Sequence, residues 1–483
     1  MLSRRATLIS LAAAALARPA LVRAGEPTFA VADLKADLRA MYDGLKEAHY
    51  DLYAMTSKAV MDRAFAEALA ALDRPMSLLQ TRIAFQRFAA VARMGHTRVD
   101  TPYDAWGAFR KAGGLGFPLD VRIVRGRMYV AADRSAAAGI GLGDEIVGLN
   151  GRPVRYWIAR AGRNVSAETD YMLWSLLEYD LALLLWLELG EAQNFELALR
   201  KPNGKRLALT LPARSAEQMA AAAKTQPPTL SLEPAREARM LEGGIAYLRP
   251  GPFFNIEAKT DAEGWDNTGF KVFTDEAFAR FEQAGATRLL VDLRGNPGGD
   301  SSFSDLVVSR FATRPFRFVS QFLVKVSPQA IAANDARLKA DAAAAGPVSR
   351  QFEALYARSK LGERVAFDVP ETPPAARRFP GKASLLIDRQ SYSNTVAVAA
   401  TVQDYGFGAV LGEETSDLAT TYGAMERLTL PKTGISVGFP KARLIRPNGD
   451  LRARGVVPDV AVAAPIVATP ADEMLQGALK AML

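Results

Sequence analysis

The 483-residue sequence contains no cysteine and only two histidines, His49 and His96. A chain without cysteine forms no disulfide, has no thiolate nucleophile and holds no iron–sulfur cluster. Two histidines are too few for a histidine-rich metal site, and the sequence has no metal-binding motif, so we expect neither a metal ion nor another cofactor. After the first 24 residues no run reaches about 18 uninterrupted apolar residues, and we expect no stable membrane insertion.

The first 24 residues have the pattern of an export signal. The pair Arg4-Arg5 precedes an apolar run over residues 6–17, and the stretch closes on Val22-Arg23-Ala24, a pattern suited to a signal peptidase. The pair resembles a twin-arginine signal, although Thr7 stands where a bulky apolar residue is usual. A frayed or membrane-anchoring N-terminus is the alternative. From the export-signal pattern we expect a periplasmic or secreted protein.

The formal net charge of +8 would favour a nucleic-acid partner if it belonged to the mature chain. Removal of the predicted signal takes away four arginines and no acid, and leaves a net charge of +4. The rest of the sequence has no basic stripe with interleaved aromatic residues. We expect no nucleic-acid partner.

Hydrophobic residues make up 49% of the chain and charged residues 23%, which is typical of a globular protein of several domains. Strands alternate with helices in the second half, whereas the first half begins helical and then becomes β-rich. The predicted fold class is α/β (α+β multidomain). We expect a signal at 1–24, a helical domain at 25–105, a β module at 106–215, a linker at 216–240 and an α/β core at 241–483.

The β module resembles a PDZ domain. Its segment from Gly143 to Val154 matches the strand and Asn-Gly turn of PDZ domains, which bind chain termini by adding the peptide as an extra strand. Alternating strands at 195–199 and 207–211 flank Asn203-Gly204, a favoured hairpin turn. An unrelated small β module is the alternative.

Two segments follow predicted buried strands and precede predicted helices, where open α/β sheets place their ligands. The first runs from Asp292 to Gly299 and ends in two glycines, which let backbone amides approach an anionic oxygen. No Lys-Ser/Thr pair follows these glycines, so the segment does not fit a phosphate loop.

The second segment, from Asp388 to Thr395, places serines at the start of a predicted helix over 394–405. The helix N-terminus there offers amide dipoles to developing negative charge. On local grounds alone, Ser391 or Ser393 could equally cap the helix.

Taken in order, these pieces resemble the C-terminal processing, or tail-specific, serine peptidase family. Its relatives include the tricorn core peptidase and the interphotoreceptor retinoid-binding protein. The matching parts are Gly95-His96-Thr97, the PDZ-like module, the Asp-Leu-Arg-x-Asn-x-Gly-Gly signature at 292–299, the serine segment ending at 403–406, and Gly455 to Asp459. The resemblance covers residues 31 to 460 and implies a ClpP/crotonase-like crossover core.

The resemblance implies roles for individual residues. The nucleophile falls on Ser393, and the oxyanion donors on the amides of Asn394 and of Gly298 or Gly299. Substrate-binding roles fall on Asp292, Arg294 and Asn296. The family's catalytic lysine and its partner glutamine are replaced by Leu418 and Tyr422, as expected for a tricorn-like branch that lacks the lysine.

A serine hydroxyl needs a base near neutral pH, and in the tricorn-like branch a histidine supplies it. His96 occupies the matching place, which predicts a rate that falls as the pH drops through roughly 6 to 7. A backbone-bonding role for His96 is the alternative. Met94 stands where relatives carry aspartate, and no acid that orients the imidazole can be assigned from the sequence. His49 matches a packing histidine.

The main hypothesis is an exported serine endopeptidase that acts on a protein or peptide substrate held by its C-terminus. A binding protein that keeps the fold without catalysis is the rival, favoured by the missing lysine and by Met94. A scaffold that acts through the PDZ-like module alone would leave the Ser393 segment unexplained.

Overall fold

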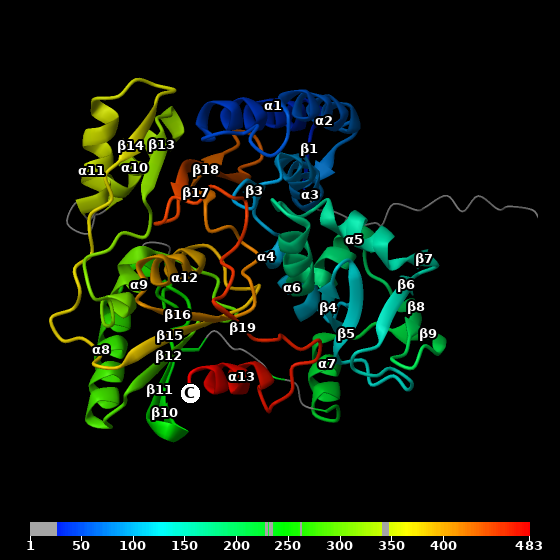
Figure 1. Cartoon of the computed structure of the whole chain (residues 1–483). Helices are drawn as coiled ribbons and strands as arrows, with labels where there is room; N and C mark the ends of the chain where they lie inside the picture. Colours follow the sequence, from blue (N-terminus) through cyan, green and yellow to red (C-terminus); the bar gives the residue numbers. More distant parts are fainter. Residues whose placement is uncertain (1–26, 228–229, 231–234, 261–262, 341–346) are drawn as a thin grey trace, which may run out of the picture.

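The computed structural model describes residues 27–227, 230, 235–260, 263–340 and 347–483. The predicted export signal at 1–24 lies outside these residues. Figure 1 shows a helical layer formed by the N-terminal residues at the top, with the β-rich domain and the α/β core side by side below it. Within the described residues, no helix is both long and apolar enough to cross a bilayer.

The N-terminal helices share a hydrophobic core with residues from near the end of the chain. These helices are α1 (Val31–Ala48), α2 (Lys58–Ala71) and α3 (Leu78–Ala89), and a capping box of Ser77 and Gln80 starts the last of them. Their buried side chains pack against Val437 and Phe439. The N-terminal helices thus fold onto the C-terminal half of the protein.

A six-stranded antiparallel sheet forms what we call the β4–β9 domain, residues 103–212. Its main strands are β4 (Leu119–Val124), β5 (Arg127–Asp133), β6 (Glu145–Leu149), β8 (Asn194–Arg200) and β9 (Arg206–Pro212), in that order, and β7 (Arg152–Pro153) pairs with β6. Its helices are α4 (Tyr103–Lys111), α5 (Val154–Gly162) and α6 (Asp170–Leu189). Strand β4 is an edge strand and α6 packs against it.

The stretch expected to be a linker contains regular structure. Helix α7 (Ala216–Ala223) starts with a capping box of Ser215 and Gln218, and alanine, the best helix former, fills most of it. Strand β10 (Glu237–Leu241) follows and joins the core sheet.

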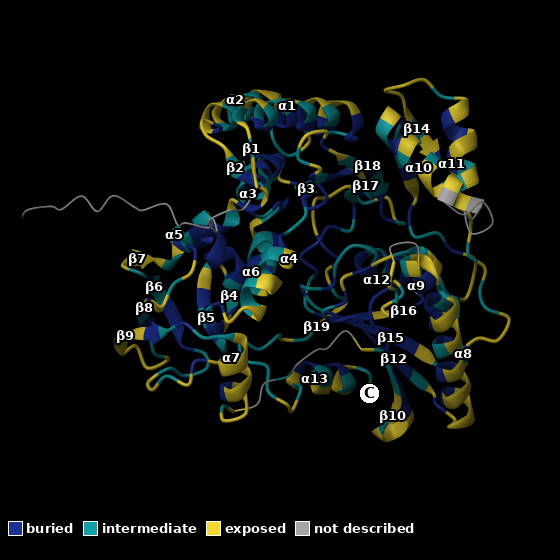
Figure 2. Cartoon of the chain, turned by 180° about the vertical axis from the view of Figure 1, so that it is seen from behind, coloured by how far each residue is buried: buried dark blue, intermediate teal, exposed yellow. Residues whose placement is uncertain are grey.

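The core sheet has the order β10-β11-β12-β15-β16-β19. Only β10 is antiparallel to its neighbour. The other strands are β11 (Ile245–Arg249), β12 (Arg288–Asp292), β15 (Lys382–Ile387), β16 (Gly408–Gly412) and β19 (Val460–Ala461). The central strands are buried on both faces (Figure 2), as expected for a parallel sheet covered by helices.

Alternate residues of each central strand face different helices. Leu289, Val291 and Leu385 pack with α8 (Thr268–Gln283), α9 (Ser301–Val308) and α12 (Asn394–Tyr405). Leu290 and Leu386 pack on the opposite face with α13 (Glu473–Ala481). The predicted α/β core and the multidomain α+β fold class are confirmed.

A second sheet, absent from the sequence-based prediction, connects the core to the N-terminal helices. Its order is β14-β13-β18-β17, with β3 (Arg98–Val99) paired to β18. Its other strands are β13 (Gln321–Lys325), β14 (Arg364–Phe367), β17 (Thr421–Thr429) and β18 (Ser436–Ile445). Between β13 and β14 lie the helices α10 (Pro328–Ala340) and α11 (Pro347–Ala357).

Truncating a core side chain tests the packing between α9 and the sheet. Phe303 is fully buried, so we expect Phe303→Ala to lower the free energy of unfolding by about 3–5 kcal/mol. Urea unfolding of the full chain, followed by tryptophan fluorescence, measures this change. Tyr179→Ala is the control, because that side chain is 74% exposed and its loss should cost under about 0.5 kcal/mol. Equal midpoints for the two variants would contradict this assignment of the core.

Candidate active site

The predicted site segments meet because three parallel strands end at the same edge of the core sheet. Strand β15 lies between β12 and β16, in a register that aligns their carboxyl ends. The loops that follow these strands, 293–299, 388–393 and 413–417, therefore lie together.

Ser393 and Ser391 have different roles in their loop. The Ser391 hydroxyl is buried and donates a hydrogen bond to the Leu293 carbonyl at 2.9 Å. Ser393 occupies the N-cap position of α12, but its side chain makes no capping hydrogen bond. Its φ of 54° is rare for a residue with a side chain, and such strain is typical of functional positions. Neither serine therefore caps the helix, and only Ser393 keeps its hydroxyl free of these structural bonds.

The double glycine lies against Ser393. A Cβ atom added at Gly298 would come within 2.9 Å of the Ser393 Cβ and 2.8 Å of the Asn394 amide nitrogen. The Gly298 amide donates to Asn296 Oδ1 at 2.9 Å. Within the described part of the chain, the amides of Gly299 and Asn394 donate no hydrogen bond. Of the two predicted glycine donors, Gly299 is therefore the one whose amide is available to an oxyanion.

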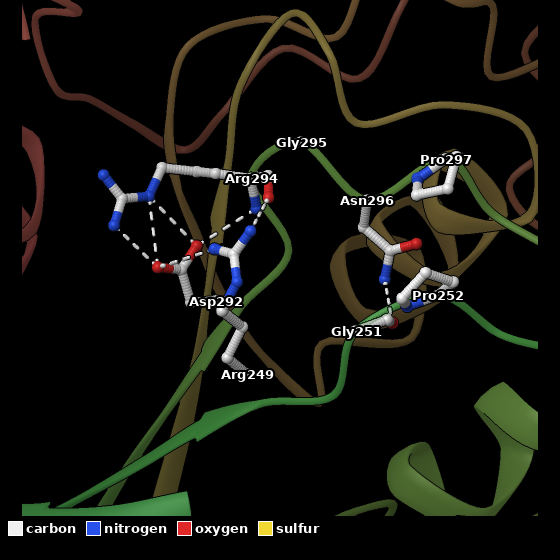
Figure 3. A pocket seen from close by; sticks show the side chains of 8 residues that line it. All are labelled: Arg249, Gly251, Pro252, Asp292, Arg294, Gly295, Asn296 and Pro297. Carbon is white, nitrogen blue, oxygen red and sulfur yellow. Dashed lines mark hydrogen bonds and ion pairs between the residues drawn. The ribbon is translucent and has the colours of Figure 1, made fainter. Parts of the chain in front are cut away.

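The three side chains expected to bind substrate are buried and already paired within the protein. The Arg294 guanidinium binds the carboxylates of Asp292 and Asp472, at 2.6 and 2.7 Å. Asn296 donates to the Gly251 carbonyl at 2.7 Å. Figure 3 shows these groups around a cavity of about 10 Å³, which holds no more than one water-sized molecule. Their contacts support the glycine loop, and a direct contact with substrate stays a prediction.

His96 lies on a turn between α3 and β3, next to the serine loop. Its ring centroid is 5.9 Å from that of Tyr392, the residue before Ser393. Among the described residues, no hydrogen bond joins the imidazole to the Ser393 hydroxyl, and Nδ1 is buried without a partner. Burial lowers the pKa of His96 below 6.5, and a hydrogen bond to the Tyr422 carbonyl opposes this shift. A ring nitrogen that donates to a carbonyl leaves the other, Nδ1, as the proton acceptor.

Asp417 is the acid that sequence reasoning missed. Its carboxylate is fully buried and accepts hydrogen bonds from the amides of Ser393 at 2.7 Å and Leu418 at 2.8 Å. Burial raises the pKa of Asp417, whereas the nearby His96 lowers it; in turn, the Asp417 charge raises the pKa of His96. Asp417 therefore holds the backbone of Ser393 and stabilises a protonated His96. Its sequence context, a loop after β16, carries no motif that would single it out.

The remaining predicted positions are filled by structural side chains. Leu418, at the place of the family's lysine, is a buried apolar residue, and Tyr422 packs against Tyr50. His49 Nε2 lies 2.8 Å from Thr97 Oγ1, while its Nδ1 accepts from the Asp51 amide. Burial of the His49 imidazole lowers its pKa to about 3. Met94, where relatives carry aspartate, is a buried apolar residue. His49 thus supports the turn that carries His96.

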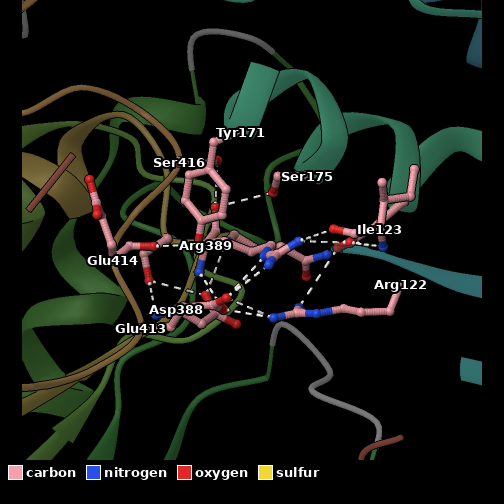
Figure 4. Close-up of polar contacts among 12 residues, drawn as sticks. Arg122, Ile123, Tyr171, Ser175, Asp388, Arg389, Glu413, Glu414 and Ser416 are labelled. Carbon is pink, nitrogen blue, oxygen red and sulfur yellow. Dashed lines mark hydrogen bonds and ion pairs between the residues drawn. The ribbon is translucent and has the colours of Figure 1, made fainter. Parts of the chain in front are cut away.

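Arg389, four residues before Ser393, connects the serine loop to the β4–β9 domain (Figure 4). Its guanidinium binds Glu413 at 2.9 Å and Glu178, on α6, at 2.8 Å. It also donates to the Ile123 carbonyl on the edge strand β4 at 2.8 Å. Arg122 completes the network by binding Glu413. The β4–β9 domain is therefore docked directly on the loop that carries the candidate nucleophile.

Comparison with known proteins finds a family match within the α/β core and a similar fold over most of the chain. Residues 266–462 match the family model of peptidase family S41. The fold is similar to that of mature CPAF, with a TM-score of 0.64 and 15% sequence identity over 94% of this chain and 96% of that one. The structure of mature CPAF complexed with lactacystin matches with the same score and identity, over 93% and 97%. No curated protein matches the chain.

Histidine titration tests the electrostatics of the site. In histidine-labelled protein, we expect NMR to show one imidazole with a pKa below 6.5, which is His96, and one that stays neutral above about pH 4. Asp417→Asn removes a charge that stabilises the imidazolium, so the His96 pKa should fall further. His96→Ala assigns the signals. A His96 pKa that rises in the Asp417 variant would contradict the proximity of the two side chains.

Proposed function

We propose that this chain is a serine peptidase of the family whose model matches residues 266–462, with Ser393 as the nucleophile and His96 as the general base. The observation that carries this proposal is the contact of Asp417 with the Ser393 amide, combined with its electrostatic coupling to His96. A part-buried serine, a buried imidazole and a buried carboxylate that stabilises the protonated imidazole are thereby brought together, as a serine nucleophile and its base require.

In the proposed reaction, Ser393 Oγ attacks the carbonyl carbon of a peptide bond while its proton passes to His96 Nδ1. The amides of Gly299 and Asn394 donate to the oxyanion of the tetrahedral intermediate. His96 then gives the proton to the leaving amine, and an acyl-enzyme remains on Ser393. Water, deprotonated by the same imidazole, hydrolyses the acyl-enzyme and releases the second product. The replacement of the family's lysine by Leu418 is compatible with this scheme, since the imidazole supplies the base.

We further propose that the protein is an exported, tail-specific endopeptidase of the periplasm or the extracellular space. The arginine pair and apolar run within residues 1–24 support export. The β4–β9 domain, taken as a PDZ-like module, offers edge strand β4 to the C-terminus of a substrate. A peptide added at Ile123 would replace the bonds that its amide and carbonyl make with Glu178 and Arg389.

A fluorophosphonate probe tests the activated serine. We expect the mature protein to be labelled, and Ser393→Ala and His96→Ala to remain unlabelled while folded. Because burial lowers the pKa of His96, the labelling rate should fall only below pH 6.5, lower than the interval suggested by an unperturbed histidine. Folded wild-type protein that neither reacts with the probe nor cleaves peptides would contradict the proposed chemistry.

A glycine pair tests the oxyanion site. Gly298→Ala should abolish probe labelling and reduce kcat by about 10²–10³-fold, because the added methyl group would collide with the Asn394 amide and displace an oxyanion donor. Gly434→Ala is a matched control: both glycines have positive φ, 93° and 69°, but nothing lies within 4 Å of a Cβ at Gly434. Similar losses in both variants would indicate backbone strain alone.

A further inference from the structure

The segment 164–168, between α5 and α6 of the β4–β9 domain, lies along the turn that carries His96. Asn164, Ser166 and Glu168 of this segment are buried and make hydrogen bonds to that turn or to the helix before it. The Asn164 side chain accepts from Arg87 at 3.0 Å, and the Ser166 hydroxyl donates to the Thr97 carbonyl at 2.7 Å. The segment therefore supports the His96 turn from the side of the β4–β9 domain.

Glu168 makes the contact nearest to the imidazole. Its Oε1 accepts a hydrogen bond from the amide of Gly95, the residue before His96, at 3.1 Å. Its backbone carbonyl accepts from the Arg93 guanidinium at 3.3 Å, at the start of the same turn. The side chain is only 3% exposed. Burying a carboxyl group this deeply is costly unless it is hydrogen-bonded, and the bond from the Gly95 amide offsets part of that cost.

The turn is tightly packed around Gly95. A Cβ atom at Gly95 would come within 2.4 Å of Met172 Cε and 2.7 Å of the Tyr392 hydroxyl. Gly95 is thus enclosed by α6 on one side and by the serine loop on the other. The Glu168 hydrogen bond holds the Gly95 amide at this crowded point.

On the basis of these contacts and of the proposed peptidase function, we propose that Glu168 is a positioning residue for the catalytic base. Its side chain, supplied by the β4–β9 domain, holds the Gly95 amide and thereby keeps His96 at the distance and angle that proton transfer from Ser393 requires. The β4–β9 domain would then be part of the catalytic machinery as well as a module for substrate recognition.

The protonation state of Glu168 decides how the test is designed. Burial, and next the charge of Asp417, raise the pKa of Glu168 to about 8, and the Arg93 guanidinium opposes this shift. Tyr392 also lies close enough for the Glu168 charge to raise its pKa. Because its pKa is about 8, the Glu168 carboxyl group is mostly neutral at pH 7. A glutamine can therefore take its place as hydrogen-bond acceptor.

Three variants of the mature protein test the proposal with a peptide substrate and the fluorophosphonate probe. For Glu168→Ala we expect kcat to fall by about 10- to 100-fold with KM unchanged, because the base is misplaced while substrate binding is not. Glu168→Gln should stay within about threefold of the wild type, because its amide oxygen can still accept from Gly95. Glu191→Ala is the matched control, since it removes a glutamate that bonds the Leu115 amide elsewhere in the same domain.

The proposal is overturned if Glu168→Ala keeps the wild-type kcat, or if Glu168→Gln loses as much as Glu168→Ala. Should Glu168→Ala fail to fold, Glu168→Asp carries the test, because it keeps the carboxyl group but shortens its reach by one methylene; wild-type kcat in that variant would overturn the proposal. Wild-type activity distinguishes this result from failure of the proposed function. An inactive wild type contradicts the peptidase chemistry, whereas an active wild type with an unaffected Glu168→Ala contradicts only the positioning role.

Discussion

The parallel pairing of β12, β15 and β16 is the constraint on which the site depends. Parallel neighbours in register end at the same edge, so the loops that follow them are neighbours even though up to about 120 residues separate them along the chain. The first loop brings Gly298 and Gly299, the second Ser393, and the third Asp417. The bond between the Asp417 carboxylate and the Ser393 amide exists because the second and third strands are adjacent.

The His96 imidazole is carried to this edge by the N-terminal part of the chain and not by a strand of the core sheet. His96 follows the N-terminal helices, and β3 then pairs with β18 of the second sheet. Those helices share their core with β17 and β18, so packing far from the site determines where His96, the proposed base, lies. Burial there has an electrostatic consequence, because it favours neutral His96 and opposes ionisation of both Asp417 and Glu168. In this cluster a proton can be held briefly by His96, whereas permanent ionisation of both Asp417 and Glu168 is unfavourable.

Docking of the β4–β9 domain depends on charged side chains buried at its contact with the core. Arg389 and Glu178 are nearly excluded from solvent and Glu413 is partly buried, and ion pairs of this kind add little net stability because desolvation offsets their attraction. They are geometrically selective, however, since an unpaired buried charge is strongly unfavourable. The network therefore favours one orientation of the domain, and in that orientation Glu168 meets the His96 turn. Catalytic geometry and domain orientation are coupled through the same interface.

The sequence by itself determined the features that depend on neighbours along the chain. Strands β12 and β15, helix α12 and the hairpins of the β4–β9 domain follow from local periodicity and turn residues, and the two motif segments fall at strand ends as predicted. The helix in the expected linker was missed although its capping box, Ser215 and Gln218, is a local signal. Strands β17 and β18 were also missed, and their pairing with β3 and packing against the N-terminal helices involve residues more than 300 positions apart.

Only the tertiary structure decided which groups do what at the site. The distinction between Ser391 and Ser393 depends on a bond to Leu293, in the loop that follows β12, and the choice of Gly299 over Gly298 depends on Asn296 accepting a bond from the Gly298 amide. Asp417 and Glu168 carry no motif, because each acts through contacts with residues distant in sequence. Short-range pattern specifies where a strand ends and a helix begins, whereas the partners of a buried polar group are set by topology and packing.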